Sequence, residues 1–216
     1  MNQIVKDKMM REIMVVKNTY LFQDVARETR FYSNDEAAFE DIILWNYEYM
    51  VRHEAEQNFD YKQPIPYAVV VDEDNRVFVY KRGGTGSNAG DSRLHSKIAF
   101  GVGGHLERED EDLTNPLQDG LAREIEEEIA IKPESIKSIE AIWYINEEET
   151  EVSQVHLGVA YIVKVHNTNV ELLDGELENG EFISLDELQA MIESGDYDVE
   201  NWSKILFEPM KKFLTY

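Results

Sequence analysis

The sequence predicts an α/β fold, because segments typical of strands and segments typical of helices follow one another along the chain. Residues 67–71 and 155–165 are rich in Val, Ile and Tyr, the composition of buried strands. By contrast, helical spacing places Leu121, Ala122, Ile125 and Ile129 on one side, which gives an amphipathic helix one apolar face. A chain of 216 residues is long enough to bury a substantial core in one or two domains.

The first 65 residues are expected to form an α+β extension. Residues 11–22 alternate weakly, as in a strand, and Ser33 with Glu36 has the spacing of a capping box that would open a helix running to about residue 57. The apolar face of that helix would be core or interface, and it comprises Ala38, Phe39, Ile42, Trp45 and Tyr49. We expect residues 1–65 to contribute dimer contacts or to cover a substrate, and residues 66–216 to form the main domain.

The main domain is expected to open with a hairpin. Pro64 and Pro66 precede the strand at 67–71, residues 72–75 form a turn, and residues 76–80 form the return strand. Further strands are predicted at 139–144 and 155–165. Ser184 and Glu187 predict a second capping box, and residues 203–216 predict a final helix interrupted by Pro209.

Composition restricts the possible partners and the cellular location. The net charge is −23, and most of the excess acid lies after residue 100, so binding to nucleic acid or to an anionic membrane is disfavoured. Cysteine is absent, which excludes disulfides, thiolate catalysis and cysteine-based zinc sites. Residues 1–17 mix charged and apolar residues unlike a signal peptide, and no segment is apolar enough to span a membrane. We therefore expect a cytoplasmic protein.

The acidic segment 123–131 predicts a metal site. At about 100° per residue, Glu124, Glu127 and Glu128 share one helix face, while Leu121 and Ile125 lie on the other. Carboxylates so close together repel one another, and a divalent cation with a preference for hard oxygen ligands relieves that repulsion. Taken alone, such a run is more often a solvated helix face. Its context favours the site, because Gly103 and Gly104 let the backbone turn tightly and approach a ligand or an ion.

These residues resemble the box of the Nudix (MutT-like) hydrolases, which reads G-x5-E-x7-R-E-U-x-E-E-x-G-U, where U is apolar. Residues 123–128 match its second half in full, Gly104 fits its first glycine, and Ile125 and Ile131 fit apolar positions. Glu107 falls where many members carry an additional glutamate. By the order of elements, the resemblance covers roughly residues 66–195.

Two departures from the box stand out. Eighteen residues separate Gly104 from Arg123, five more than usual, so the first Glu of the box has no unique equivalent; the candidates are Asp110, Asn115, Glu109, Glu111 and Asp112. Asn115 and Pro116 also read as an N-cap and a first helical residue, so the insertion is expected to lengthen the loop and leave the helix intact. Ala130 replaces the last glycine, which concerns helix termination more than chemistry.

The resemblance implies an α/β/α sandwich with a mixed sheet and hydrolysis, by water, of a nucleoside diphosphate linked to another moiety. It implies that Glu124, Glu127, Glu128 and the Gly103 carbonyl hold Mg²⁺ or Mn²⁺, and that Arg123 keeps the glutamates in register. Glu124 is the expected base and Glu181 the reserve base. The absence of cysteine argues against the isoprenoid isomerase branch of the family.

Positive charge gathers just before this segment. Arg82, Arg93, His95 and Lys97 surround a glycine-rich stretch that lacks the Gly-Lys-Ser/Thr ending of a Walker loop. They would bind an anionic substrate, although an exposed basic loop without a ligand has the same composition. His105, beside Gly104, is a candidate orienting group, and a lone histidine is more often structural.

Two other function classes remain open at this stage. A catalytically silent Nudix-like module would bind a nucleotide derivative as a sensor, since fold does not fix function. A structural acidic protein that buffers divalent ions is the other, but it gives no account of the Gly103–Gly104 turn. The identity of the substrate and the oligomeric state, with a homodimer as one option, are left open by the sequence.

Overall fold

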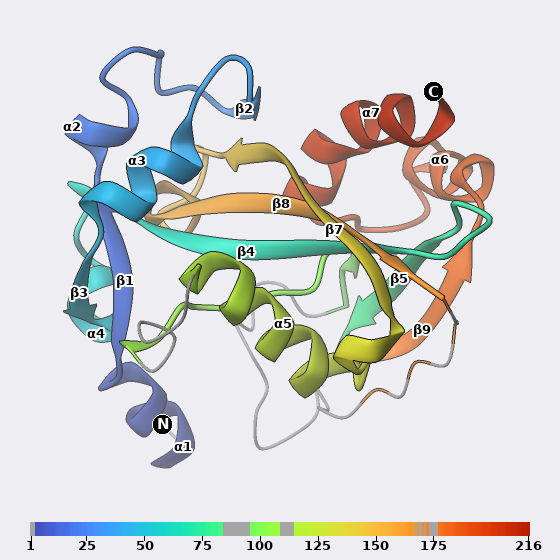
Figure 1. Cartoon of the computed structure of the whole chain (residues 1–216), viewed down its shortest axis with the longest axis horizontal. Coiled ribbons are helices and arrows are strands. Elements are labelled where there is room, and N and C mark those ends of the chain that lie inside the picture. The colour runs from blue at the N-terminus through green and yellow to red at the C-terminus, as the bar shows by residue number, and fades with distance from the viewer. Residues whose placement is uncertain are drawn as a thin grey trace. The chain divides into compact units, whose positions relative to one another are not determined.

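The structure is a computed structural model that describes residues 3–83, 96–108, 115–166, 168, 170, 172 and 177–216. The helices are α1 Gln3–Met9, α2 Asn18–Leu21, α3 Phe39–Asn46, α4 Arg52–Ala55, α5 Pro116–Ile129, α6 Leu185–Ser194 and α7 Asn201–Thr215, with the 3₁₀ turns η3 Pro133–Ser135 and η4 Ser153–Val155. The strands are β1 Glu12–Lys17, β2 Arg30–Ser33, β3 Glu48–Val51, β4 Tyr61–Val71, β5 Val77–Arg82, β6 Ile98–Ala99, β7 Ile136–Asn146, β8 His156–Val165 and β9 Leu177–Ile183 (Figure 1). Among the described residues, no helix is both long and apolar enough to cross a membrane.

The chain divides into two compact units, which we describe separately. The first contains residues 1–67, 103–122 and 141–161, and the second contains residues 68–102, 123–140 and 162–216. The helix α5 and the strands β4, β7 and β8 each contribute residues to both units.

The first unit is built on β1, which pairs antiparallel with β3 on one edge and with the start of β4 on the other. The strands follow the order β2-β7-β8-β4-β1-β3, in which β2 pairs antiparallel with β7. An aromatic cluster centres on Phe39 of α3, whose ring lies 5.0 Å from Tyr144, 5.3 Å from Tyr32 and 5.6 Å from Phe22. The Glu40 amide donates to the Tyr144 hydroxyl (3.0 Å), which attaches the start of α3 to β7.

The predicted long helix from residue 33 to 57 is wrong. Ser33 ends β2, and α3 begins at Phe39 and stops at Asn46, after which the chain continues into β3. The capping box does not form because Arg30 of β2 binds both carboxylate oxygens of Glu36. Trp45, which we expected on an apolar face, is 85% exposed.

The second unit is organised around β5, which pairs antiparallel with β4, β6 and β9. The predicted hairpin is confirmed, with Val71 opposite Val77. Asp72 closes its turn, because its Oδ1 accepts from the amides of Asp74 (3.0 Å) and Arg76 (2.8 Å). A parallel bridge between Ile98 and Val199 makes the pairing in this unit mixed.

The helix α5 begins where its sequence suggests, and it ends without the expected glycine. Asn115 Oδ1 accepts from the amides of Leu117 (3.1 Å) and Gln118 (3.3 Å), the hydrogen bonds of an N-cap, and Pro116 is the first helical residue. The helix stops at Ile129, and Ala130 adopts φ +52°, the left-handed conformation that the family's glycine would supply. Loss of that glycine therefore does not prolong the helix.

Two further predictions concern the C-terminal helices. The Ser184–Glu187 capping box is confirmed at the start of α6, which ends at Gly195 with φ +72°. The predicted interruption at Pro209 is wrong, since α7 runs through Pro209 from Asn201 to Thr215. Packing compensates for the hydrogen bond that a proline removes, because Leu206, Phe207 and Met210 are all buried.

Candidate functional site

The glutamate-bearing face of α5 lies in its second half. Arg123 Nη1 donates to Glu124 Oε1 (2.7 Å) and to Glu127 Oε2 (3.3 Å), so one guanidinium contacts both carboxylates. The side chain of Glu124 is 13% exposed and that of Glu127 is 61% exposed. Glu128 is half-buried. On the opposite face, Ile125 and Ile129 are fully buried, so the helix presents its carboxylates together as the periodicity predicts.

Gly103 lies where no side chain fits. A β-carbon at this position would lie 1.8 Å from the carbonyl oxygen of Pro66 in β4. The close backbone approach that the glycine permits is therefore to the chain's own strand. Its carbonyl as a metal ligand stays a prediction.

Other acidic candidates have different surroundings. Glu107 forms an ion pair with Arg11 at 2.7 Å. Asn115, one candidate for the first Glu of the box, is the cap of α5. The remaining candidates lie outside the described residues, namely Glu109, Asp110, Glu111 and Asp112.

Two of the four predicted substrate-binding cations are neighbours in the second unit. The Arg82 amide donates to the Lys97 carbonyl (2.8 Å), and Arg82 Nη2 contacts Glu200 Oε1 at 3.4 Å. Arg93 and His95 lie outside the described residues. Glu181, the reserve base, is exposed on β9 opposite Val79.

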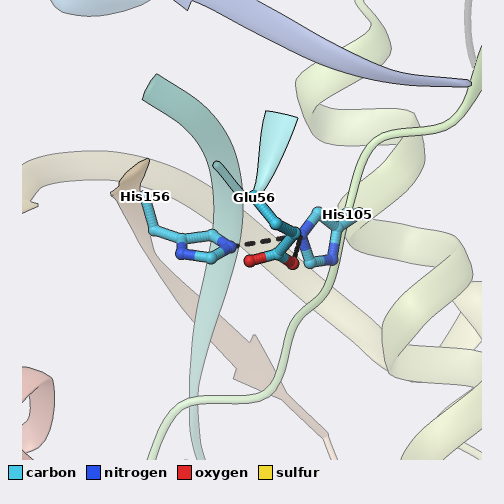
Figure 2. Close-up of side chains that lie close together, drawn as sticks. All are labelled: Glu56, His105 and His156. Atoms are coloured by element: carbon cyan, nitrogen blue, oxygen red, sulfur yellow. Dashed lines mark hydrogen bonds and ion pairs between the residues drawn. The ribbon is translucent and has the colours of Figure 1, made fainter. Parts of the chain in front are cut away.

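A cluster that the sequence analysis missed surrounds His105 in the first unit (Figure 2). His105 Nε2 lies 3.2 Å from His156 Nε2, 2.8 Å from Gln63 Oε1 and 3.8 Å from Glu56 Oε1. Burial lowers the pKa of His105 well below its usual value, and Arg52 and His156 act in the same direction. Burial also lowers the pKa of His156, opposed by Glu56. Both rings are therefore neutral at pH 7.

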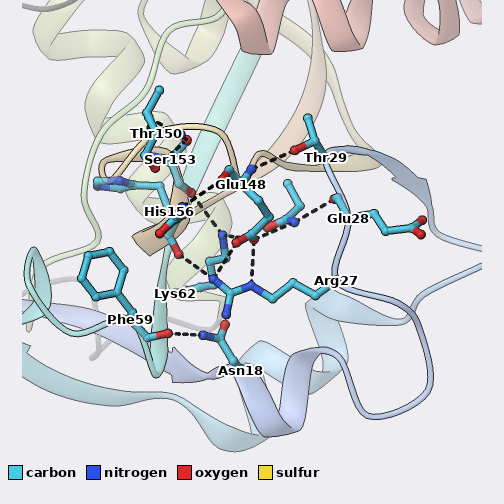
Figure 3. A network of polar contacts seen from close by, with 12 residues as sticks. Asn18, Arg27, Glu28, Thr29, Phe59, Lys62, Glu148, Thr150, Ser153 and His156 are labelled. Atoms are coloured by element: carbon cyan, nitrogen blue, oxygen red, sulfur yellow. Dashed lines mark hydrogen bonds and ion pairs between the residues drawn. The ribbon is translucent and has the colours of Figure 1, made fainter.

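A buried lysine organises a second polar network in the same unit (Figure 3). Lys62 Nζ donates to Glu148 Oε1 (2.8 Å) and to the Ser153 carbonyl (3.1 Å), and Arg27 contacts the other carboxylate oxygen at 2.7 Å. Glu148 thus neutralises two cations that come from distant parts of the chain.

Comparison with known proteins decides the family. A model described as NUDIX domain matches residues 62–203, about two thirds of the chain. The chain belongs to the Nudix family. It is 32% identical to Protein YmaB of Bacillus subtilis (strain 168) over 204 residues, which cover 92% of this chain and 93% of that protein.

Solved structures agree with this assignment. The crystal structure of Tm1382, titled a putative Nudix hydrolase, is 29% identical with a TM-score of 0.73, over 94% of this chain and 99% of that one. The NUDIX domain of Shewanella oneidensis NrtR, crystallised with ADP ribose, shares the fold at 12% identity and a TM-score of 0.52, over 71% of this chain and 88% of that one. The predicted α/β/α fold with a mixed sheet is confirmed, and this family and fold support a hydrolase of the pyrophosphohydrolase type.

Proposed function

We propose that the protein hydrolyses the pyrophosphate linkage of a nucleoside diphosphate joined to another moiety, in a reaction that depends on Mg²⁺ or Mn²⁺. The observation that carries this proposal is the face of α5, where Arg123 contacts Glu124 and Glu127 within 3.3 Å. Those residues occupy the positions at which the Nudix box has its arginine and two of its glutamates.

The carboxylates of Glu124, Glu127 and Glu128 suit a divalent metal. Their oxygens are the hard donors that Mg²⁺ and Mn²⁺ prefer, and they stand on one helix face at i, i+3 and i+4. By the family pattern, the Gly103 carbonyl joins this set. A metal bound there would neutralise phosphate charge and lower the pKa of a bound water.

The protein's own groups have distinct parts in the proposed reaction. Glu124 accepts the proton of the attacking water on a carboxylate oxygen, and the phosphoanhydride bond breaks as the new P–O bond forms. Arg123 orients Glu124 through the 2.7 Å contact. Arg82 and Lys97, with Arg93 and His95, would bind phosphate oxygens, and Glu181 is the reserve base.

A nucleotide derivative is the proposed substrate class, and the fold shared with the NrtR domain crystallised with ADP ribose puts that compound in the test panel. We further propose a cytoplasmic location, consistent with the acidic, cysteine-free composition. The division into an extension at 1–65 and a catalytic domain at 66–216 belongs to the same proposal.

The test compares two Glu→Gln variants of the same helix on a panel of nucleoside triphosphates, ADP-ribose, nucleotide sugars and dinucleoside polyphosphates, with Mg²⁺, with Mn²⁺ and with chelator. Glu127→Gln removes a proposed ligand and should lower kcat by about 100-fold or more, the usual cost of losing a charge-stabilising group. Glu126→Gln is the matched control, because Glu126 is exposed and adjacent to Glu127 but lies off the glutamate face.

Full activity of Glu127→Gln would refute the metal assignment. If no panel member is cleaved by the wild type but one binds tightly without Mg²⁺, the chain is a nucleotide-binding sensor and the hydrolase proposal fails.

A further inference from the structure

Four side chains converge in the first unit from segments far apart in the sequence. Glu56 follows α4, Gln63 lies in β4, His105 follows the Gly103–Gly104 turn, and His156 opens β8. One ligand atom each from Glu56, His105 and His156 fits within a span of 4.8 Å (Figure 2). A carboxylate and two imidazoles at this spacing form the donor set of many three-residue zinc sites.

We propose that Glu56, His105 and His156 bind a transition-metal dication, with Zn²⁺ as the best fit. Ligand atoms about 2.0–2.1 Å from a tetrahedral Zn²⁺ lie roughly 3.4 Å from one another. His105 Nε2 lies 3.2 Å from His156 Nε2 and 3.8 Å from Glu56 Oε1, which brackets that value. Gln63 Oε1, 2.8 Å from His105 Nε2, adds a fourth donor atom beside the cluster.

Hydrogen bonding leaves His156 ready to coordinate. Its Nδ1 lies 2.7 Å from the Val152 carbonyl oxygen. Because a carbonyl only accepts, Nδ1 carries the hydrogen, and in the neutral ring Nε2 keeps its lone pair toward His105. Metal-binding histidines are commonly oriented by such a bond from the other ring nitrogen to a carbonyl.

Gln63 shows that this cluster is not fully satisfied by protein contacts. Its side chain is 1% exposed, and its Nε2 is buried without a hydrogen-bond partner among the described residues. A buried NH₂ group without an acceptor is costly, and a water held by a bound ion would supply that acceptor. With a metal bound, Gln63 Oε1 would coordinate the ion instead of accepting a hydrogen bond from His105 Nε2.

The local charge selects the kind of metal. Arg52 Nε lies 3.3 Å from Glu56 Oε1 and offsets its negative charge, so the imidazole nitrogens dominate the site. Nitrogen donors favour Zn²⁺, Co²⁺ or Ni²⁺ over Mg²⁺ and Ca²⁺. The site thus differs in chemistry from the all-carboxylate face of α5, and this inference does not rest on the proposed hydrolase function.

The test uses the full chain after treatment with EDTA and its removal. ZnCl₂ is titrated by calorimetry in excess Mg²⁺, which occupies the carboxylates of α5, and thermal unfolding is followed in parallel. We expect one Zn²⁺ per chain and a rise in Tm, because the ion binds only the folded arrangement. Co²⁺ in place of Zn²⁺ should give visible absorption bands typical of tetrahedral coordination.

Variants locate the site. Glu56→Gln keeps the side-chain shape and His156→Ala removes a ligand; each should weaken Zn²⁺ binding by more than about 10-fold, since even the partners of ligands contribute that much. His166→Gln is the matched control, because it removes an exposed histidine outside the cluster. Glu127→Gln should also keep the site.

The proposal is overturned if the wild type takes up no Zn²⁺ in excess Mg²⁺. It is equally overturned if Glu56→Gln, shown to be folded by circular dichroism, binds Zn²⁺ as the wild type does, or if binding is lost in Glu127→Gln.

Discussion

Ala130 carries a backbone conformation that suits glycine. Its φ of +52° places the β-carbon close to the following peptide, which costs an L-residue about 1–2 kcal/mol. The residue tolerates this because it follows α5 directly, and its amide still donates to the Glu126 carbonyl (3.2 Å).

Ala130→Gly should therefore stabilise the protein by about 0.5–1 kcal/mol, the relief of strain less the greater entropy that glycine has in the unfolded chain. Thermal unfolding should show a rise in Tm of roughly 2–3 °C. The matched control is Ala122→Gly inside α5, which should lower stability by about 1 kcal/mol. Equal destabilisation by both variants would contradict the assigned strain.

Single residues differ in how far the sequence alone predicts their surroundings. The grouping of Glu124, Glu127 and Glu128 follows from helical periodicity, which is local. The contact between His105 and His156 joins residues 51 positions apart, and only the fold brings them together. A histidine that opens an apolar strand was the available signal for His156.

At the scale of an element, α5 depends on its cap. Asn115 Oδ1 satisfies two amides at the start of the helix, and its Nδ2 donates to Glu40 Oε1 (3.1 Å). Asn115→Ala should cost about 1 kcal/mol in the free energy of unfolding, measured by urea denaturation. Asn115→Ser keeps a capping oxygen while losing the Glu40 contact, so it should stay close to the wild type. Equal losses in both variants would assign the effect to Glu40.

Helix boundaries were predicted well where capping is local and poorly where it competes with other contacts. Ser184 and Glu187 bind each other at the start of α6 as expected. Ser33 and Glu36 have the same spacing, but Arg30 binds the Glu36 carboxylate. That competition, together with the pairing of β3 with β1, divides a segment that reads as one helix.

At the scale of the whole molecule, Lys62 makes the stability of the fold change with pH in the alkaline range. Burial lowers the pKa of Lys62 to about 8 from its ordinary 10.5, against the opposing effect of Glu148. Between these values the unfolded chain binds more protons than the folded one, so stability rises as pH increases through this window. The interval between the two pKa values corresponds to about 3 kcal/mol in the free energy of unfolding.

Chemical denaturation of wild type and Lys62→Met at pH 7, 8, 9 and 10 checks this expectation. The difference in unfolding free energy, wild type minus variant, should increase above pH 8, while contributions from tyrosines cancel. A difference that stays flat from pH 7 to 10 would mean that Lys62 titrates alike in both states.

The first residues of β4 fix the register in which that strand pairs with its neighbours. From Lys62 to Val71 every residue is buried, so no alternation of polar and apolar side chains distinguishes one alignment from the next. Lys62 and Gln63 distinguish the correct alignment, because Lys62 contacts Glu148 and Gln63 contacts His105. A slip by one residue in one direction would set the Lys62 ammonium against the two imidazoles and Tyr61 against Glu148, and a slip in the other direction would set the Gln63 amide against Glu148. Two consecutive buried polar residues thus specify the register of β4. They disfavour shifted pairings that a purely apolar strand would allow.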